Sequence, residues 1–142
     1  MIFVDTNVWL RSVQPTHPLH QTAVDAIAAL IGASELLVIT PQIAAEFWNV
    51  ATRPVSANGF GFTTDEARQQ VNRLEGFFSV LAESPEVYAE WKRLVVANDV
   101  QGVKVHDTRI VAAMNVYGIS RILTFNSADF ARYTGLEVIE PT

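Results

Sequence analysis

Five side chains with carboxylate or amide oxygens occupy positions that could serve one metal centre: Asp5, Glu46, Asp107, Asn126 and Asp129. Clustered carboxylates repel one another, so such a cluster needs a compensating charge. A hard divalent cation such as Mg²⁺ or Mn²⁺ supplies that charge and takes oxygen ligands. A cation of this kind binds a phosphate oxygen and lowers the pKa of bound water. The chemistry that these residues favour is therefore phosphodiester hydrolysis.

The hydrophobic pattern predicts strands and helices in alternation along the chain. Short apolar runs typical of buried strands occur at 2–4, 36–39, 122–124 and 137–139, with a further short strand within 78–81. Helical spacing of apolar residues follows at 18–31, from 41, from 64, from 85 and at 106–117, and 127–130 fits a short helical turn. Turn residues mark 53–62 as a loop. Strands separated by helices predict an α/β fold with a parallel sheet covered on both faces.

This arrangement gives a reason for the acids to meet. Ligands of an open parallel sheet bind at the carboxyl ends of its strands. Asp5 directly follows the first strand, and Glu46 lies about one and a half turns into the helix that leaves the second. Asp107 lies in the first turn of its helix, and Asn126 and Asp129 follow the strand at 122–124. We therefore expect all five side chains at one edge of the sheet.

Each acid also has a structural alternative. Asp5 and Asp129 are residue types that cap helices. Glu46 could be a solvated helix residue, although it lies between Ala45 and Phe47 in an apolar helix. Asp107 could simply favour the positive end of a helix dipole. The metal-site prediction depends on the joint placement of these residues.

Four motifs resemble those of the PIN domain, and within that group the VapC-type toxins of bacterial toxin–antitoxin pairs. They are Phe3–Val8, Thr40–Pro54, Val105–Ala113 and Leu123–Phe130, in family order and covering nearly the whole chain. The resemblance implies a three-layer α/β/α sandwich formed by one nuclease domain, residues 1–142. It also implies RNA as substrate, a homodimer, and a cognate antitoxin whose peptide occupies the active-site groove.

The same resemblance implies roles for individual residues. Asp5 and Asp107 are expected as the main ligands of Mg²⁺ or Mn²⁺, with Glu46 completing the acidic set. Thr6 and Asn7 belong to the first motif and are expected to orient Asp5 or to bind the scissile phosphate.

The fourth motif departs from the family pattern. Many relatives carry an acid where this chain has Asn126, a neutral oxygen ligand. Asp129 could supply the missing charge or only support its helical turn. The fourth acidic position and the number of metal ions therefore stay open.

Other residues are candidates for substrate contacts. Arg53 and Arg109 could bind phosphate, because the guanidinium fork suits phosphate oxygens, and surface salt bridges are the alternative. The three tryptophans, Trp9, Trp48 and Trp91, occupy helical positions, so we expect them to pack in the core or an interface and not to stack on bases.

Composition narrows the remaining possibilities. The chain has 142 residues, no cysteine and a net charge of −5. This length fits one domain, and the lack of cysteine excludes disulfides and thiolate metal sites. The acidic balance disfavours a passive nucleic-acid binder but is compatible with a metal-neutralised nuclease site and a basic partner. With no bilayer-length apolar run and no basic, apolar leader, we expect a cytoplasmic protein without membrane contact.

Two rival functions are compatible with parts of this pattern. Asp5 could be the nucleophile of an aspartyl-phosphate phosphatase, but such motifs carry a second Asp where this chain has Asn7. The chain could also be a non-catalytic module that binds RNA or protein. Binding of a divalent metal ion would distinguish the two, because only the nuclease needs a metal site.

Overall fold

Five parallel strands form the centre of the molecule. The computed structural model describes residues 1–142. The strands are β1 (Ile2–Val4), β2 (Leu37–Ile39), β3 (Ser79–Val80), β4 (Arg121–Leu123) and β5 (Glu137–Ile139), in the order β3-β2-β1-β4-β5. Phe3 pairs with Val38 of β2 on one side and with Ile122 of β4 on the other. The chain therefore adds β2 and β3 on one side of β1 and later returns to add β4 and β5 on the other side.

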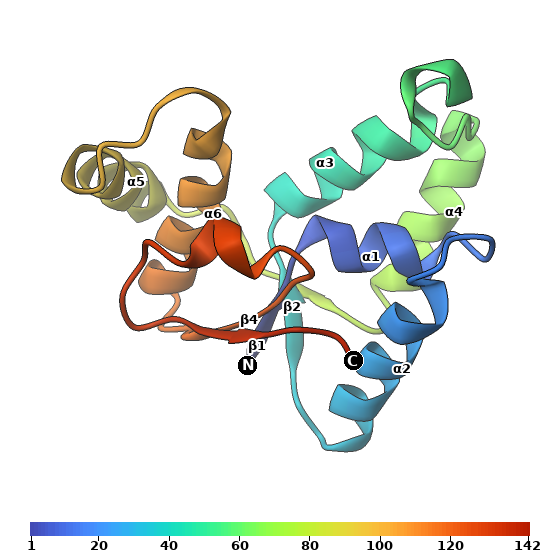
Figure 1. The fold of residues 1–142 in the computed structure, drawn as a ribbon, viewed down its shortest axis with the longest axis horizontal. Coiled ribbons are helices and arrows are strands. Elements are labelled where there is room, and N and C mark those ends of the chain that lie inside the picture. The colour runs from blue at the N-terminus through green and yellow to red at the C-terminus, as the bar shows by residue number, and fades with distance from the viewer.

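Six α-helices cover this sheet. They are α1 (Thr6–Ser12), α2 (His20–Gly32), α3 (Pro41–Thr52), α4 (Thr64–Leu74), α5 (Pro85–Ala97) and α6 (Val105–Val116). Short 3₁₀ helices occur at η1 (Val55–Ala57), η2 (Gly102–Lys104) and η3 (Ser127–Phe130). Right-handed crossovers in this strand order place α1 to α4 on one face and α5 and α6 on the other. Figure 1 shows these two groups on opposite sides of the strands.

Local sequence signals explain where several helices begin. Asp5 caps α1 by accepting a hydrogen bond from the Thr6 backbone N–H. Thr63 and Glu66 form a capping box at the start of α4. Proline occupies the first position of α3 and of α5, where its missing N–H costs nothing.

The core lies where the sheet meets its helices. Every residue of β1 and β2 is buried, as expected of strands covered on both faces. Trp9 of α1 stacks on Phe47 of α3, with ring centroids 3.8 Å apart and an interplanar angle of 4°. This contact fixes the position of α3, the helix that carries Glu46.

The α/β prediction is confirmed, including the short third strand, and two boundary residues correct it. Leu36 was expected inside a buried strand, but it precedes β2 and is 49% exposed. The helix expected over 18–31 begins only at His20, and Leu19, the residue before α2, is 38% exposed. Both lie where an element has not yet begun, so the periodic pattern extended too far. No helix combines the length and the apolar character that a membrane crossing requires.

Candidate functional site

Asp5 lies at the carboxyl end of the central strand, between β2 and β4. Its Oδ1 accepts from the Thr6 backbone N–H at 2.8 Å, and its Oδ2 accepts from Thr124 Oγ1 at 2.7 Å and from Asn7 Nδ2 at 3.0 Å. Burial nevertheless raises the pKa of Asp5 to about 6, with smaller contributions from the charges of Asp107 and Glu46. Desolvation of the buried carboxylate therefore outweighs the hydrogen bonds from Thr124 and Thr6, which lower this pKa.

Glu46 reaches the same edge from α3. Its Oε2 accepts from Thr6 Oγ1 at 2.6 Å, and its Oε1 accepts from Gln42 Nε2 at 2.9 Å. Gln42, which is buried, also donates to the backbone carbonyl of His106 at 2.9 Å. One side chain thus links the carboxylate of α3 to the start of α6 on the opposite face of the sheet.

Asp107 approaches from α6, where it occupies the first turn. It is partly buried, and no hydrogen bond to its carboxylate is formed by any residue of the chain. The pKa of Asp107 is raised, first by burial and then by the charges of Asp129 and Glu46, against the opposing effect of Lys104. The negative charge of Asp107 is therefore stabilised by fewer hydrogen bonds and ion pairs of the protein than that of Asp5, Glu46 or Asp129.

The two candidates for the fourth position differ in their surroundings. Asp129 forms an ion pair with Lys104 at 2.6 Å and lies close enough to act on the pKa of Asp107. The Asn126 side chain is exposed and forms no hydrogen bond, while its backbone N–H donates to Thr124 Oγ1 at 3.0 Å. The structure thus brings Asp129 to the acidic edge with a lysine already bound to it.

Neither Arg53 nor Arg109 forms a hydrogen bond with Asp5, Glu46 or Asp107. The Arg109 guanidinium contacts both oxygens of Glu83 at 3.2 Å, on the outer side of α6. Arg53 follows the last turn of α3 and donates to the Asn58 backbone carbonyl at 3.3 Å. Arg53 lies seven residues beyond Glu46, which corresponds to roughly 10 Å along the helix axis.

The residues present fit a hard divalent cation by their chemistry. The candidate metal ligands at this edge are all oxygen atoms. Each carboxylate oxygen can accept about two hydrogen bonds, and Asp5 Oδ1 and the two Glu46 oxygens accept one each, so each of them keeps a free lone pair for a cation. As the side chains stand, no three acidic or histidine residues converge closely enough to hold an ion. Mg²⁺ typically keeps several waters and takes only one or two protein carboxylates, so full convergence is not required.

Three residues of this network were not singled out from sequence. Thr124 is fully buried and joins Asp5, Asn7 and Asn126 through its hydroxyl. Gln42 could have been found from its spacing, because a residue four positions before Glu46 lies on the same helix face. Lys104 carries no such signal, since its partner Asp129 is 25 residues away.

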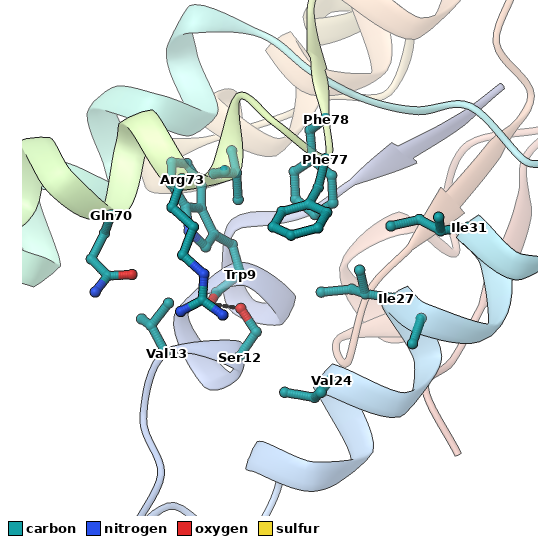
Figure 2. Close-up of a pocket in the computed structure, with 12 residues that line it drawn as sticks. Trp9, Ser12, Val13, Val24, Ile27, Ile31, Gln70, Arg73, Phe77 and Phe78 are labelled. Carbon is teal, nitrogen blue, oxygen red and sulfur yellow. Dashed lines mark hydrogen bonds between the residues drawn. The ribbon is translucent and has the colours of Figure 1, made fainter.

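An apolar pocket of about 200 Å³ lies apart from the acids, between α1, α2 and α4. Figure 2 shows Ile27 and Ile31 of α2 facing Phe77 and Phe78 across it. Ile31 is 39% and Phe77 is 55% exposed. No carboxylate lines this pocket, so it offers a surface for apolar contacts and no metal chemistry.

Comparisons with known proteins agree with the fold. The family model described as PIN domain matches residues 2–136. A search of curated proteins found no match. Among solved structures, VapC20 of Mycobacterium tuberculosis, described as a sarcin-ricin loop cleaving toxin, is 19% identical with a TM-score of 0.68, covering 92% of this chain and 94% of that chain.

Two toxin–antitoxin complexes are similar at comparable identity. VapBC2 from Rickettsia felis, bound to a DNA fragment from its promoter, is 12% identical with a TM-score of 0.72, covering 99% of this chain and 98% of that chain. VapBC-1 from nontypeable Haemophilus influenzae is 17% identical with a TM-score of 0.72 and the same coverage. At these identities the likeness shows a shared fold.

Proposed function

The chain belongs to the PIN-domain family, and from this premise we propose that it is a metal-dependent endoribonuclease, the toxin of a toxin–antitoxin pair. The observation that carries the proposal is the buried Asp5 at the end of the central strand. Its pKa is raised to about 6, and Glu46 and Asp107 act on it from opposite faces of the sheet. Burying a carboxylate among like charges is costly, and a bound cation offsets that cost.

Each residue at the edge has a proposed role. Asp5, Glu46 and Asp107 would hold Mg²⁺ or Mn²⁺, with Asp129 adding charge and Asn126 adding a neutral oxygen. Bound there, the ion would polarise the scissile phosphate and lower the pKa of a water that hydrolyses it. Thr6 orients Glu46 through a hydroxyl hydrogen bond, and Asn7 orients Asp5 through its amide.

The two arginines are proposed to bind parts of the RNA that neighbour the reacting phosphate, and not that phosphate itself. Arg109 is only partly occupied by Glu83, at 3.2 Å, and its side chain is 43% exposed. Arg53 lies too far along α3 to touch a phosphate held by Asp5, so it can contact only a neighbouring part of the strand.

Purified protein should cleave single-stranded RNA with Mg²⁺ or Mn²⁺ and stop with EDTA. Asp5→Asn and Asp107→Asn should each lower kcat by at least about 100-fold, as expected when a group that stabilises the transition state is removed. Asp25→Asn, an exposed acid on α2, is the matched control and should retain full activity. Cleavage that persists in both site variants would identify a contaminating nuclease and remove the proposal.

We further propose that the chain forms a homodimer and binds an antitoxin protein. Solved relatives were crystallised as toxin–antitoxin complexes. The apolar pocket of Figure 2, with Ile31 and Phe77 exposed beside it, is the kind of surface that a protein partner covers.

Co-expression tests this partner. The product of a short reading frame beside the gene should co-purify with the wild-type chain and block its RNA cleavage. Phe77→Asp should abolish co-purification while free cleavage activity remains. Sedimentation of the chain alone should give twice the monomer mass. Equal capture of the Phe77→Asp variant would show that the partner binds elsewhere.

A further inference from the structure

A second pocket, of about 410 Å³, lies between the first half of α5 and the start of α6. It is lined by aromatic, apolar and hydrogen-bonding side chains of both helices and of the residues just before α5. Tyr88 is 66% exposed, and its ring lies 6.2 Å from that of Trp91 at an interplanar angle of 30°. The indole N–H of Trp91 donates to the Val105 carbonyl at 2.9 Å, so the orientation of this ring is fixed.

The charges in this pocket favour a flat, uncharged ligand. Arg109 is its one guanidinium, and Glu83 contacts that group through both carboxylate oxygens. The pair carries no net charge, so it attracts a phosphate less strongly than a free arginine does, although the rest of the guanidinium stays open to hydrogen bonding. What the pocket does offer is two aromatic faces, a guanidinium plane and the imidazole of His106. Unstacked bases bind proteins by stacking on such faces and by hydrogen bonds to their edges.

The pocket and the carboxylate edge share the start of α6. His106 lines the pocket, and the next residue is Asp107. The His106 carbonyl accepts from Gln42, whose amide also donates to Glu46. A small neighbouring cavity is lined by Gln42 together with Glu83 and Arg109, which also line the larger pocket. These shared residues place the pocket within reach of a strand that is bound at the acids.

We propose that this pocket binds one unstacked nucleobase of the RNA, adjacent to the phosphate held at the carboxylate edge. The proposal rests on the proposed function for the identity of the polymer. Tyr88 and Trp91 supply the stacking faces, and Arg109, held by Glu83, covers the base or donates to its edge. This assigns a stacking role to Trp91, a residue that sequence alone suggested would only pack.

The test is RNA binding in EDTA, so that no cleavage occurs. Anisotropy of labelled short single-stranded RNA should show Tyr88→Ala binding roughly 5- to 150-fold more weakly, the range for removing one base-stacking ring. Tyr88→Phe keeps the ring and should bind as the wild type does. Val96→Ala, on the same helix and 76% exposed, is the control for a surface truncation outside the pocket. Because Tyr88 is largely exposed, its loss should leave folding intact.

An abasic ribose-phosphate oligomer of equal length separates base from phosphate recognition. The wild type should prefer RNA over this oligomer, and Tyr88→Ala should lose that preference. Equal binding of both oligomers by the wild type would make the pocket a phosphate site and overturn the proposal. A change from dimer to monomer in Tyr88→Ala, with RNA affinity retained, would overturn it too and assign the pocket to an interface between copies.

Cleavage kinetics with Mn²⁺ separate this inference from the proposed function. With both correct, Tyr88→Ala raises KM and leaves kcat nearly unchanged. If Tyr88→Ala shows metal-dependent cleavage with an unchanged KM, the base pocket is disproved and the nuclease proposal stands. If RNA binding depends on Tyr88 but the wild type cleaves no RNA, the base pocket stands and the nuclease proposal is disproved.

Discussion

At the scale of single residues, Asp5 shows how a capping residue can also be a site residue. The sequence left two alternatives for it, a helix cap or a metal ligand. Its Oδ1 caps α1, and the same oxygen keeps a free lone pair, so the two roles are compatible. Burial dominates its electrostatics and raises its pKa to about 6 despite the hydrogen bonds from Thr6, Asn7 and Thr124.

This raised pKa predicts a pH-dependent stability in EDTA. The folded protein holds the proton more tightly than the unfolded chain, whose Asp pKa is 3.8. The stabilisation is therefore complete below pH 3.8 and is lost as the pH rises through about 6. Relative to Asp5→Asn, the free energy of unfolding of the wild type should fall by about 3 kcal/mol over this window.

Urea unfolding of both proteins between pH 3.5 and 8, at roughly one-unit steps, measures this difference. Comparison with Asp5→Asn cancels the titration of the groups that do not interact with Asp5, which are all but its neighbours Asp107 and Glu46. Two parallel curves of free energy against pH would mean that Asp5 titrates normally and that its burial is not costly.

At the scale of elements, the acids are joined by helices from opposite faces of the sheet. Gln42 of α3 donates to Glu46 on its own helix and to the His106 carbonyl at the start of α6. The i, i+4 spacing of Gln42 and Glu46 was readable from sequence, but the contact with α6 was not, because it spans 64 residues. Gln42 therefore connects α3 to α6 and at the same time holds Glu46, the acid on α3.

Gln42→Leu should destabilise the protein by about 1–3 kcal/mol, because Glu46 and the His106 carbonyl each lose a hydrogen bond from the buried Gln42 amide. It should also lower RNA cleavage, since Glu46 is released from one of its two hydrogen bonds. Gln69→Leu is the matched control, because Gln69 makes the same i, i+4 contact to Asp65 at 2.9 Å on an exposed face. That control should change stability by less than about 0.5 kcal/mol. Equal effects of the two substitutions would show that the link to α6 carries no free energy.

At the scale of the whole molecule, a bound cation should stabilise the fold. Asp5 directly follows β1 in the sheet, Glu46 lies on α3 and Asp107 lies on α6, so the three acids join all three layers. A ligand that binds only the folded state stabilises it by about 2.7 kcal/mol at 100 times its dissociation constant. For a chain of this size that corresponds to a rise in Tm of roughly 5 to 10 °C.

Thermal unfolding with and without Mn²⁺ measures this rise. Asp5→Asn and Asp107→Asn should lose most of it, whereas Asp25→Asn should show the full shift. Identical shifts in all four proteins would mean that Mn²⁺ binds outside the carboxylate edge.

The sequence by itself determined the order of elements, the parallel sheet and the positions of the acids at strand ends. These features follow from local periodicity, caps and prolines, which depend only on near neighbours in the chain. The tertiary structure decided which groups compensate each acid. It placed Thr124 against Asp5, bound Lys104 to Asp129 and Glu83 to Arg109, and left Asp107 without a donor. Such pairings join residues 25 or more positions apart, so no local pattern records them, and burial, which sets the pKa of Asp5, exists only once the layers have packed.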